Sequence, residues 1–457
     1  MNGWDSIRRR FASDRLARAF AMFFATSLAA RGVSIVCQLL QVPLVVSALG
    51  GESFGLWMTM TSLTSLVLFA DFGLGLGAQN RLAELFARDR RDEARRLLGG
   101  VFLVLALLGI LLGVACTWLV PRLDFTALFR LHETAAISEA PSAALAVGWV
   151  FCAGFPCGLG QRLAFARQEG WRYNVTQAAG NLLALCAVAA GVAAGWRFAA
   201  LAVVAQGSVL AGNALLLASQ LRQLGWLRGW RLRPPLRELA DLLRVGACFS
   251  VQQLLTTVLF SLPQVIISTR LGAAAVTPYN LVQRLFNLFA VVQNAFMLPL
   301  WPAYSRAKAR NEFGWIRRNL RRSLWATAFA SVLPMVAGAG FVPVLIRWWV
   351  GPAAPRPDLS LVWLLCAWNA VVFLQQPFSY MLAGVSELRR TTFYSVLGGA
   401  GSTVLMCLLA PTRGADGVVL GLLAGYLPFC LLGFMHEARR YLNGVPVPAG
   451  RPAPQAP

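Results

Sequence analysis

The stretch FAMFFATSLAARGVSIVCQLLQVPLVVSA (residues 20–48) decides the fold class, because Arg31 is its only charged residue. A transmembrane α-helix needs about twenty consecutive, mainly apolar residues at 1.5 Å rise each, and this run is longer. It follows Arg8, Arg9 and Arg10, as the apolar part of a signal peptide would, but it is too long for one. We therefore predict that it remains in the protein as the first membrane-spanning helix.

Similar apolar stretches recur along the rest of the chain. They lie at about 54–77, 97–120, 141–163, 173–195, 198–219, 245–269, 276–301, 323–346, 359–384, 393–411 and 417–437. Because the gap between the fifth and sixth spans is short, eleven spans is the alternative to twelve. The chain is 57% hydrophobic and 13% charged, whereas soluble domains average about a quarter charged residues. The sequence predicts an all-α polytopic membrane protein with about twelve transmembrane helices.

Basic residues are distributed unevenly between the predicted loops. With the N-terminus in the cytoplasm, the inward segments hold 32 of the 41 Lys and Arg residues and the outward loops hold 7. Short cytoplasmic loops carry such an excess in membrane proteins. We predict a bacterial inner-membrane protein with both termini in the cytoplasm. A basic cytoplasmic face next to anionic membrane lipids accounts for the net charge of +22 without nucleic acid as a partner.

An internal repeat divides the predicted spans into two parallel sets of six. At a shift of 222 residues, Leu49-Gly50 and Trp57 correspond to Leu271-Gly272 and Tyr279. Two such repeats are expected to surround a central path. We predict an N-terminal bundle at 1–219, a cytoplasmic linker at 220–244, a C-terminal bundle at 245–440 and a disordered Pro-rich tail at 441–457.

Polar side chains interrupt the first, seventh and eighth predicted helices. A charge inside the bilayer costs several kcal/mol, so it faces a cavity or a partner. Arg31 is therefore interpreted as a cation that faces a central lumen and holds an anionic group, or as a residue paired with a neighbouring helix. Both readings also apply to the other candidate substrate-binding residues, which are Gln38, Gln41, Gln253, Gln264, Asn280, Arg284 and Asn287.

Acidic residues are almost absent from the predicted spans. Asp71 could take up a proton or Na⁺ as a coupling ion, although a salt bridge with Arg81 or another basic residue is the more ordinary role. The glycine-rich GLGLG at 73–77 follows a membrane helix rather than a strand, so it predicts no phosphate loop. No catalytic residue set, metal site or cofactor is predicted.

Two blocks of sequence resemble a known family. The segments QLLQVPLVVSALGGESFGLWMTMTSL (38–63) and ADFGLGLGAQNRLAEL (70–85) are similar to the N-terminal signature of the polysaccharide (O-antigen type) flippases. STRLGAAAVTPYNLVQRL (268–285) is similar to the opening of that family's second repeat. The family belongs to the multidrug/oligosaccharidyl-lipid/polysaccharide exporter superfamily.

The resemblance implies a V-shaped pair of six-helix bundles around a cationic cavity. It further implies a flippase that moves an undecaprenyl-pyrophosphate-linked oligosaccharide to the outer leaflet by alternating access. Arg31 and Arg284 would contact the pyrophosphate or acidic sugars, and other polysaccharide-assembly membrane proteins would be partners. Gln264 departs from related sequences, which often carry an acid in the seventh helix, so the resemblance does not extend to ion coupling.

Three alternatives remain, of which a bacterial membrane scaffold without transport is disfavoured by the paired polar helices. A cation-coupled multidrug exporter of the same superfamily would prefer membrane-embedded carboxylates, whereas this chain offers arginines. A membrane-embedded polysaccharide polymerase or ligase is expected to carry a large outward loop with catalytic residues, and the predicted outward loops are short.

Overall fold

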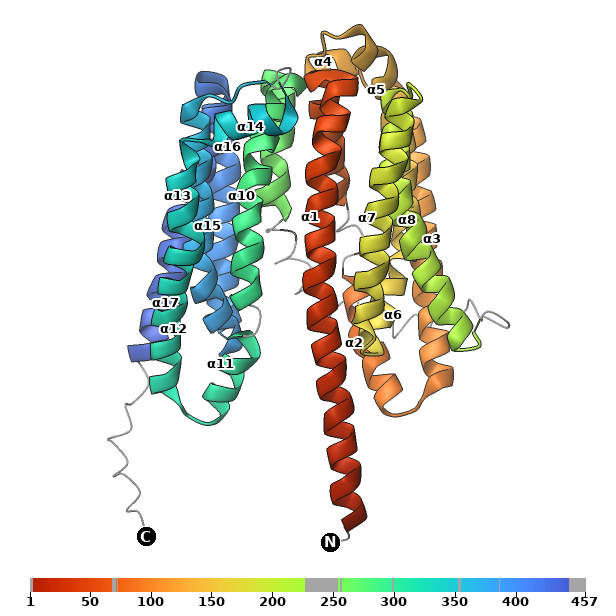
Figure 1. Ribbon diagram of the computed structural model, residues 1–457, viewed down its shortest axis with the longest axis vertical. Coiled ribbons are helices and arrows are strands. Elements are labelled where there is room, and N and C mark those ends of the chain that lie inside the picture. Colours follow the sequence, from red (N-terminus) through yellow and green to blue (C-terminus); the bar gives the residue numbers. More distant parts are fainter. Residues whose placement is uncertain are drawn as a thin grey trace. The chain divides into compact units, whose positions relative to one another are not determined.

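The computed structural model describes residues 3–67, 71, 73–226, 254, 257–297, 300–351, 355–385 and 387–443, and every regular element in them is helical (Figure 1). The prediction of an all-α chain is confirmed. The α-helices are α1 (Gly3–Val67), α2 (Leu74–Ala87), α3 (Arg91–Leu119), α4 (Phe125–Phe129), α5 (Thr134–Cys157), α6 (Leu159–Ala166), α7 (Gly170–Ala193), α8 (Phe198–Gln223), an unlabelled helix Thr257–Leu271, α10 (Val276–Met297), α11 (Leu300–Ala309), α12 (Phe313–Thr327), α13 (Leu333–Ala339), α14 (Val342–Val350), α15 (Leu359–Gly384), α16 (Leu388–Tyr426) and α17 (Gly433–Asn443).

The predicted membrane spans lie mainly on helical residues in the part of the chain that the structure describes, and turns interrupt them at Gly73, at Gly158 and at 340–341. There, seven segments are long and apolar enough to cross a membrane, and a pair of helices bent by 82°, Phe313–Ala339 and Val342–Val350, makes an eighth. Two of the seven segments each hold two predicted spans, because α1 and α16 pass through the non-helical glycines Gly50 and Gly414. The seventh and eighth predicted spans correspond to the shorter helix Thr257–Leu271 and to the more polar α10.

The chain folds into two compact units. The first contains residues 1–277 and 348–355, and the second contains residues 278–347 and 356–457. The predicted linker at 220–244 lies mostly in the stretch between Trp226 and Leu254 that the structure does not describe. The predicted division of the chain into halves therefore stays a prediction.

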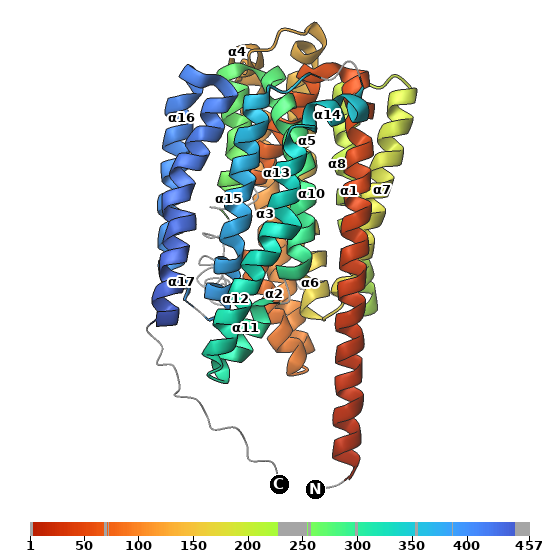
Figure 2. The ribbon, with the colours of Figure 1, turned by 60° about the vertical axis from the view of Figure 1, so that its left-hand side comes forward.

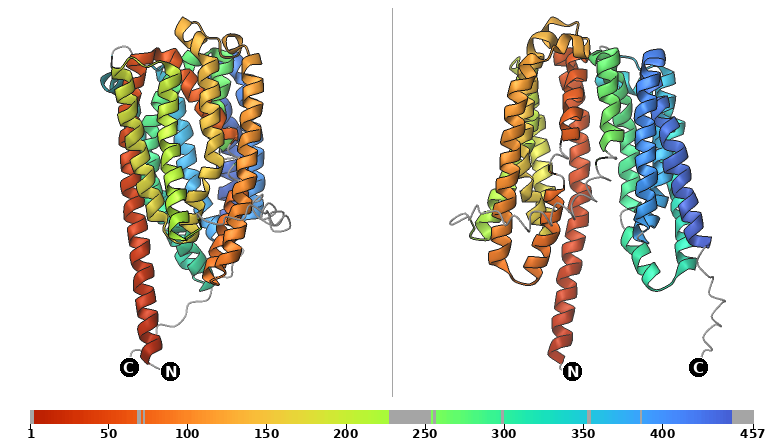
Figure 3. Two further views of the ribbon diagram at one scale, coloured as in Figure 1. Left: turned by 90° about the vertical axis from the view of Figure 1, so that its right-hand side faces the viewer. Right: turned by 180° about the vertical axis from the view of Figure 1, so that it is seen from behind.

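In the first unit, α7 lies between α1 and α8, while α5 packs on both α3 and α8 (Figures 1 and 3). The turn that joins α2 to α3 lies at the end of this unit opposite α4 (Figure 3). Fully buried leucines from three helices, including Leu82 of α2, Leu97 of α3 and Leu163 of α6, form a core near that turn. α7 is the main neighbour of α1 in this unit.

In the second unit, α15 packs against α11, α12, α16 and α17 (Figure 2). Tyr304, Ile316, Met381 and Phe434 are buried together where these helices meet. Single π-helical turns at Ala328–Val332 and Leu427–Leu432 interrupt the long helices of this unit. Such turns widen the local backbone spacing and leave the helix continuous.

The predicted repeat has the same backbone conformation at corresponding positions. Gly50 (φ 81, ψ 169) and Gly272 (φ 98, ψ 157) lie 222 residues apart and share a conformation that favours glycine. At the same shift, Asp89 (φ 53) and Asn311 (φ 56) are both left-handed residues in turns between helices. The register read from the sequence is thus confirmed at these two pairs of turns.

Candidate functional site

Helix α1 presents two of the predicted site residues to the outside of the first unit. Arg31 and Gln38 are both exposed, and their spacing of seven residues places them on one helix face. Among the described residues, the Arg31 guanidinium has no hydrogen-bond or ion-pair partner. Gln38 does take part in a polar or ring contact. The cation of Arg31 is therefore available to a ligand.

Next to these residues, Pro43 changes the polarity of α1. Proline has no N–H, so the carbonyl four residues earlier loses its helical donor. That carbonyl belongs to Leu39, and it accepts a hydrogen bond from Trp349 Nε1 at 2.8 Å. The buried Gln41 Nε2 lacks a partner among the described residues. Polar groups therefore gather around one turn of an otherwise apolar helix.

The predicted polar residues of the seventh span are only partly described. Gln264 accepts a hydrogen bond from Ser62 Oγ at 2.8 Å and so links helix Thr257–Leu271 to α1. Its predicted role in substrate binding stays a prediction, since one end of its amide already serves helix packing. Gln253 lies outside the described residues.

Some of the polar side chains of α10 pack against α15, and others remain at least partly exposed. Gln283 and Asn369 exchange two amide hydrogen bonds, of 3.1 and 3.2 Å, between α10 and α15. Asn287 accepts from Gln283 Nε2 at 3.1 Å and is exposed. Asn280 is buried, whereas Arg284 is half-buried, and both take part in polar contacts. Of the predicted residues here, Arg284 and Asn287 keep the surface that ligand binding requires.

The amide pair in the second unit makes a testable contribution to stability. Asn369→Leu removes both reciprocal bonds and leaves the Gln283 carbonyl oxygen buried, which costs about 1–2 kcal/mol for a bond between membrane helices. Asn294→Leu on α10 is the matched control, because among the described residues Asn294 bonds only the carbonyl of Ala290 in its own helix. The thermal unfolding midpoint in detergent should fall clearly for the first variant and little for the second. Equal midpoints would show that the pair is not a packing element.

Asp71 lies in the break between α1 and α2. Its two carboxylate oxygens accept the backbone N–H groups of Gly73 at 3.0 Å and of Gly75 at 3.3 Å, at the start of α2. Arg162 of α6 is its charged neighbour, while Arg81 pairs with Glu84 instead. These contacts favour the structural role over ion coupling, which stays a prediction.

The sequence reasoning missed a carboxylate cluster between α1 and the segment before α5. Glu52 is buried, and its Oε1 accepts the backbone N–H of His132 at 2.6 Å and that of Glu133 at 3.1 Å. Glu133 in turn lies against Gly50. The available signal in the sequence was Glu52, an acid directly after the Gly50-Gly51 pair. Its hydrogen-bond partners lie about eighty residues further along the chain.

This cluster makes the stability of the protein depend on pH. Partial burial, and then the charge of Glu52, raise the pKa of Glu133. A carboxyl with a raised folded-state pKa stabilises the fold below its unfolded pKa, and that stability is lost as pH rises through the folded pKa. Glu133→Gln should therefore raise the thermal midpoint at about pH 8 and not at about pH 4. Because Glu133 is largely exposed, the gain is below about 1 kcal/mol. Equal shifts at both pH values would contradict this origin.

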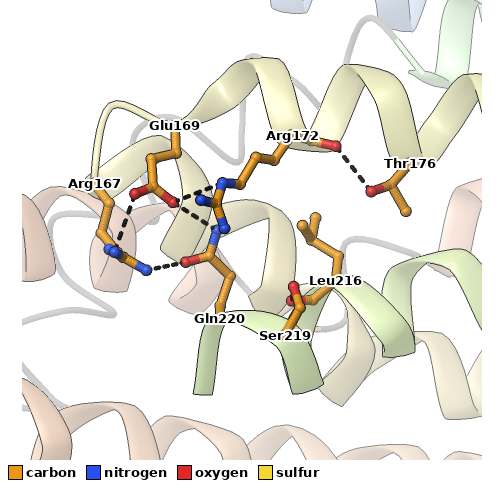
Figure 4. Close-up of polar contacts among 7 residues, drawn as sticks. All are labelled: Arg167, Glu169, Arg172, Thr176, Leu216, Ser219 and Gln220. Carbon is orange, nitrogen blue, oxygen red and sulfur yellow. Dashed lines mark hydrogen bonds and ion pairs between the residues drawn. The ribbon is translucent and has the colours of Figure 1, made fainter. Parts of the chain in front are cut away.

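A second missed network surrounds the turn between α6 and α7 (Figure 4). The Glu169 carboxylate pairs with Arg167 at 3.0 Å and with Arg172 at 3.3 Å. Gln220 of α8, which is fully buried, donates to Glu169 at 3.1 Å and accepts from Arg167. Two guanidinium groups share the Glu169 carboxylate, and Gln220 bridges it to Arg167, so the network joins α6, α7 and α8.

Taken together, the described polar groups are suited to binding rather than to bond-breaking. Guanidinium groups hold phosphate or carboxylate oxygens, and amide and hydroxyl side chains bind sugar hydroxyls. Both kinds are embedded in apolar helices, which is where transport pathways place their polar residues. The polar groups of each unit, taken separately, therefore have the chemistry to hold anionic or hydroxyl-rich groups, and their role in substrate binding stays a prediction.

Comparison with known proteins agrees with this chemistry. A family model described as "Polysaccharide biosynthesis protein" matches residues 24–308. A protein provisionally named an O-antigen export protein, from Yersinia pseudotuberculosis, is 20% identical over 88% of this chain and 92% of its own length. An O-antigen transporter from Salmonella typhi, also named provisionally, is 22% identical over 88% of this chain and 93% of its own length.

Two solved structures share the fold at low sequence identity. An inward-facing multidrug transporter of the MATE family, in the MOP superfamily, has a TM-score of 0.71 at 16% identity and covers 90% of this chain and 94% of its own. The lipid II flippase MurJ in an inward closed conformation has a TM-score of 0.69 at 12% identity, over 90% of this chain and 87% of its own.

Proposed function

Because the chain belongs to the polysaccharide biosynthesis protein family, we propose that it flips an undecaprenyl-pyrophosphate-linked oligosaccharide across the bacterial inner membrane by alternating access. It is a multi-pass membrane transporter and not an enzyme, as its relatives are named for export and transport. We further propose that the cargo is lipid-linked, that the chain lies in the inner membrane with both termini in the cytoplasm, and that transport proceeds by alternating access.

The observation that carries the proposed cargo is the exposed Arg31 in an apolar helix. A guanidinium without a counter-charge is unfavourable at membrane depth unless an anionic group visits it. A pyrophosphate supplies such a group and can be held by two hydrogen bonds to one arginine. Arg284 and Asn287 of the second unit have the chemistry for further phosphate or sugar oxygens.

The exposed arginines of α12 support the proposed orientation of the chain in the membrane. Arg317, Arg318, Arg321 and Arg322 are all exposed on α12, in a segment that the charge distribution places in the cytoplasm. Such clusters attract anionic lipid headgroups. We keep proton or Na⁺ coupling within the proposal without assigning it to Asp71, whose carboxylate is engaged at the start of α2.

Deletion of the gene tests the proposed function. We expect lipid-linked oligosaccharide to accumulate in the inner membrane and surface polysaccharide to disappear, with rescue by the wild-type chain. Arg31→Ala should not rescue, and Arg31→Lys should rescue in part, since it keeps the charge and loses the two-point hydrogen bonding. Arg81→Ala is the matched control, because Arg81 is paired with Glu84 at the surface.

The amount of each variant in the membrane must be measured alongside rescue. Failure of Arg31→Ala at a normal membrane level supports the cationic binding site. Unchanged precursor in the deletion strain, together with a new sensitivity to cationic drugs, would replace the flippase by the multidrug exporter. Lipid-linked units that accumulate in the outer leaflet rather than the inner one would favour a polymerase or ligase, because the precursor would then have been flipped without this chain.

A further inference from the structure

Helix α14 turns sharply away from the membrane-spanning helix that precedes it. The chain is helical from Phe313 to Ala339, through α12 and α13, and α14 follows after a bend of 82° at residues 340–341 (Figures 1 and 2). Spanning helices are tilted by about 20° on average from the normal of the membrane. A helix bent by 82° from such a span therefore lies close to the membrane plane.

One face of α14 carries large apolar side chains that are exposed. They are Phe341 (72% exposed), Val344 (69%), Leu345 (43%) and Trp348 (83%). Their spacing of three, four and seven residues places them in one stripe along the helix. The other face of α14 is buried and consists of Val342, Ile346 and Val350. The helix is thus apolar on both faces, and only one of them is covered by the described residues.

The length of the preceding helix places α14 at a membrane boundary. At 1.5 Å per residue, the chain rises about 27 Å between the exposed Arg322 of α12 and Gly340. The hydrocarbon core of a bilayer is about 30 Å thick. With Arg322 at the cytoplasmic boundary, α14 begins at the outer boundary. The choice of the outer side rests on the orientation given under the proposed function, whereas the position in the membrane plane does not depend on it or on the cargo.

The residue types of α14 suit the boundary between hydrocarbon and lipid headgroups. Tryptophan is enriched at that level of the membrane, and Trp348 is the most exposed side chain of the stripe. Arg347 is also exposed and borders the stripe beside Val344, where a guanidinium can hold a lipid phosphate. We propose that α14 is an interfacial helix, which lies in the membrane plane and embeds Phe341, Val344 and Trp348 in the lipid of the outer leaflet.

Depth measurements with single spin labels test this position. The full chain, with its native cysteines replaced, is reconstituted in vesicles of phosphatidylethanolamine and phosphatidylglycerol. Phe341→Cys, Val344→Cys and Trp348→Cys are each labelled with a nitroxide, and depth is obtained from the relative access of oxygen and a nickel chelate. We expect the same depth at all three positions, near the level of the headgroups.

Helix α3 supplies a matched control with the same spacing of three and seven residues. Leu111, Val114 and Trp118 are 66%, 56% and 62% exposed on this helix, which is long and apolar enough to cross the membrane. Labels at these positions should change in depth by about 10 Å from residue 111 to residue 118, at 1.5 Å per residue. An equally large change from residue 341 to residue 348 would show that α14 continues across the membrane and would overturn the proposal.

The same labels identify any other occupant of the exposed stripe. Full access of the nickel chelate would place the stripe in water, and shielding from both oxygen and nickel would place it against protein. Dipolar broadening between singly labelled chains would identify that protein as a second copy. Each of these results overturns the lipid contact.

The side of the membrane is tested separately, at the exposed Asp358 that precedes α15. Asp358→Cys in intact spheroplasts should react with a membrane-impermeant maleimide added outside. Reaction only from the cytoplasmic side, in inverted vesicles, would overturn the outer position and the proposed orientation together. Neither this labelling nor the depth measurement requires transport, so a chain that moves no oligosaccharide but shows equal depths would reject the cargo and retain the interfacial helix.

Discussion

Gly55→Ala is expected to reduce transport by about a hundredfold while the protein still reaches the membrane. A methyl group at residue 55 would overlap the Ala273 carbonyl oxygen and stand 2.8 Å from the carbonyl carbon. Both partners are backbone, so neither can rotate away. Overpacking of this kind costs up to about 3 kcal/mol, and each 1.4 kcal/mol changes an equilibrium tenfold. The arrangement in which the Ala273 carbonyl packs against Gly55 would become less populated by that factor.

The control for this variant is Gly207→Ala in α8, where an added methyl group meets no atom within 4 Å. Alanine is favoured over glycine inside a helix by up to about 1 kcal/mol, so this variant should transport normally and unfold at an equal or slightly higher temperature. Transport is measured in proteoliposomes, and folding by the thermal midpoint in detergent. Wild-type transport by Gly55→Ala would show that the close approach to Ala273 is dispensable.

Membrane spans were predictable from the sequence because local composition determines them. Twenty apolar residues form a helix in lipid whatever their neighbours are, since every backbone group must be paired. The register of the repeat was predictable for a similar reason, because Gly50 and Gly272 are needed for the turns they occupy. Neither inference required knowledge of which helices touch.

Partners across long sequence separations could not be predicted in this way. Asp71 was assigned an ordinary salt bridge, and its actual charged neighbour, Arg162, lies 91 residues away on α6. Gln283 carries a polar side chain of the kind expected along a lumen, yet it bonds Asn369 on another helix. Residue type reveals that a polar group in a membrane helix needs a partner, whereas only packing determines whether that partner is protein or cargo.

The α6–α7 turn carries the other large expected effect. Glu169→Ala should destabilise the protein by about 2–4 kcal/mol, because it removes the carboxylate between Arg167 and Arg172 and deprives the buried Gln220 of its acceptor. Breaking a fully buried ion pair costs about 3–5 kcal/mol. The value here is lower because these three charged side chains are 20–28% exposed.

Glu84→Ala provides the matched control for the Glu169 variant. Glu84 also forms an ion pair with arginine, but its side chain is 56% exposed, and exposed pairs contribute below about 1 kcal/mol. Glu169→Gln separates charge from hydrogen bonding, since it keeps an oxygen acceptor for Gln220 and removes the negative charge. We expect the thermal unfolding midpoint of Glu169→Gln in detergent to lie between those of the wild type and Glu169→Ala. If Glu169→Ala and Glu84→Ala unfold at the same temperature, the three-helix junction does not depend on this network.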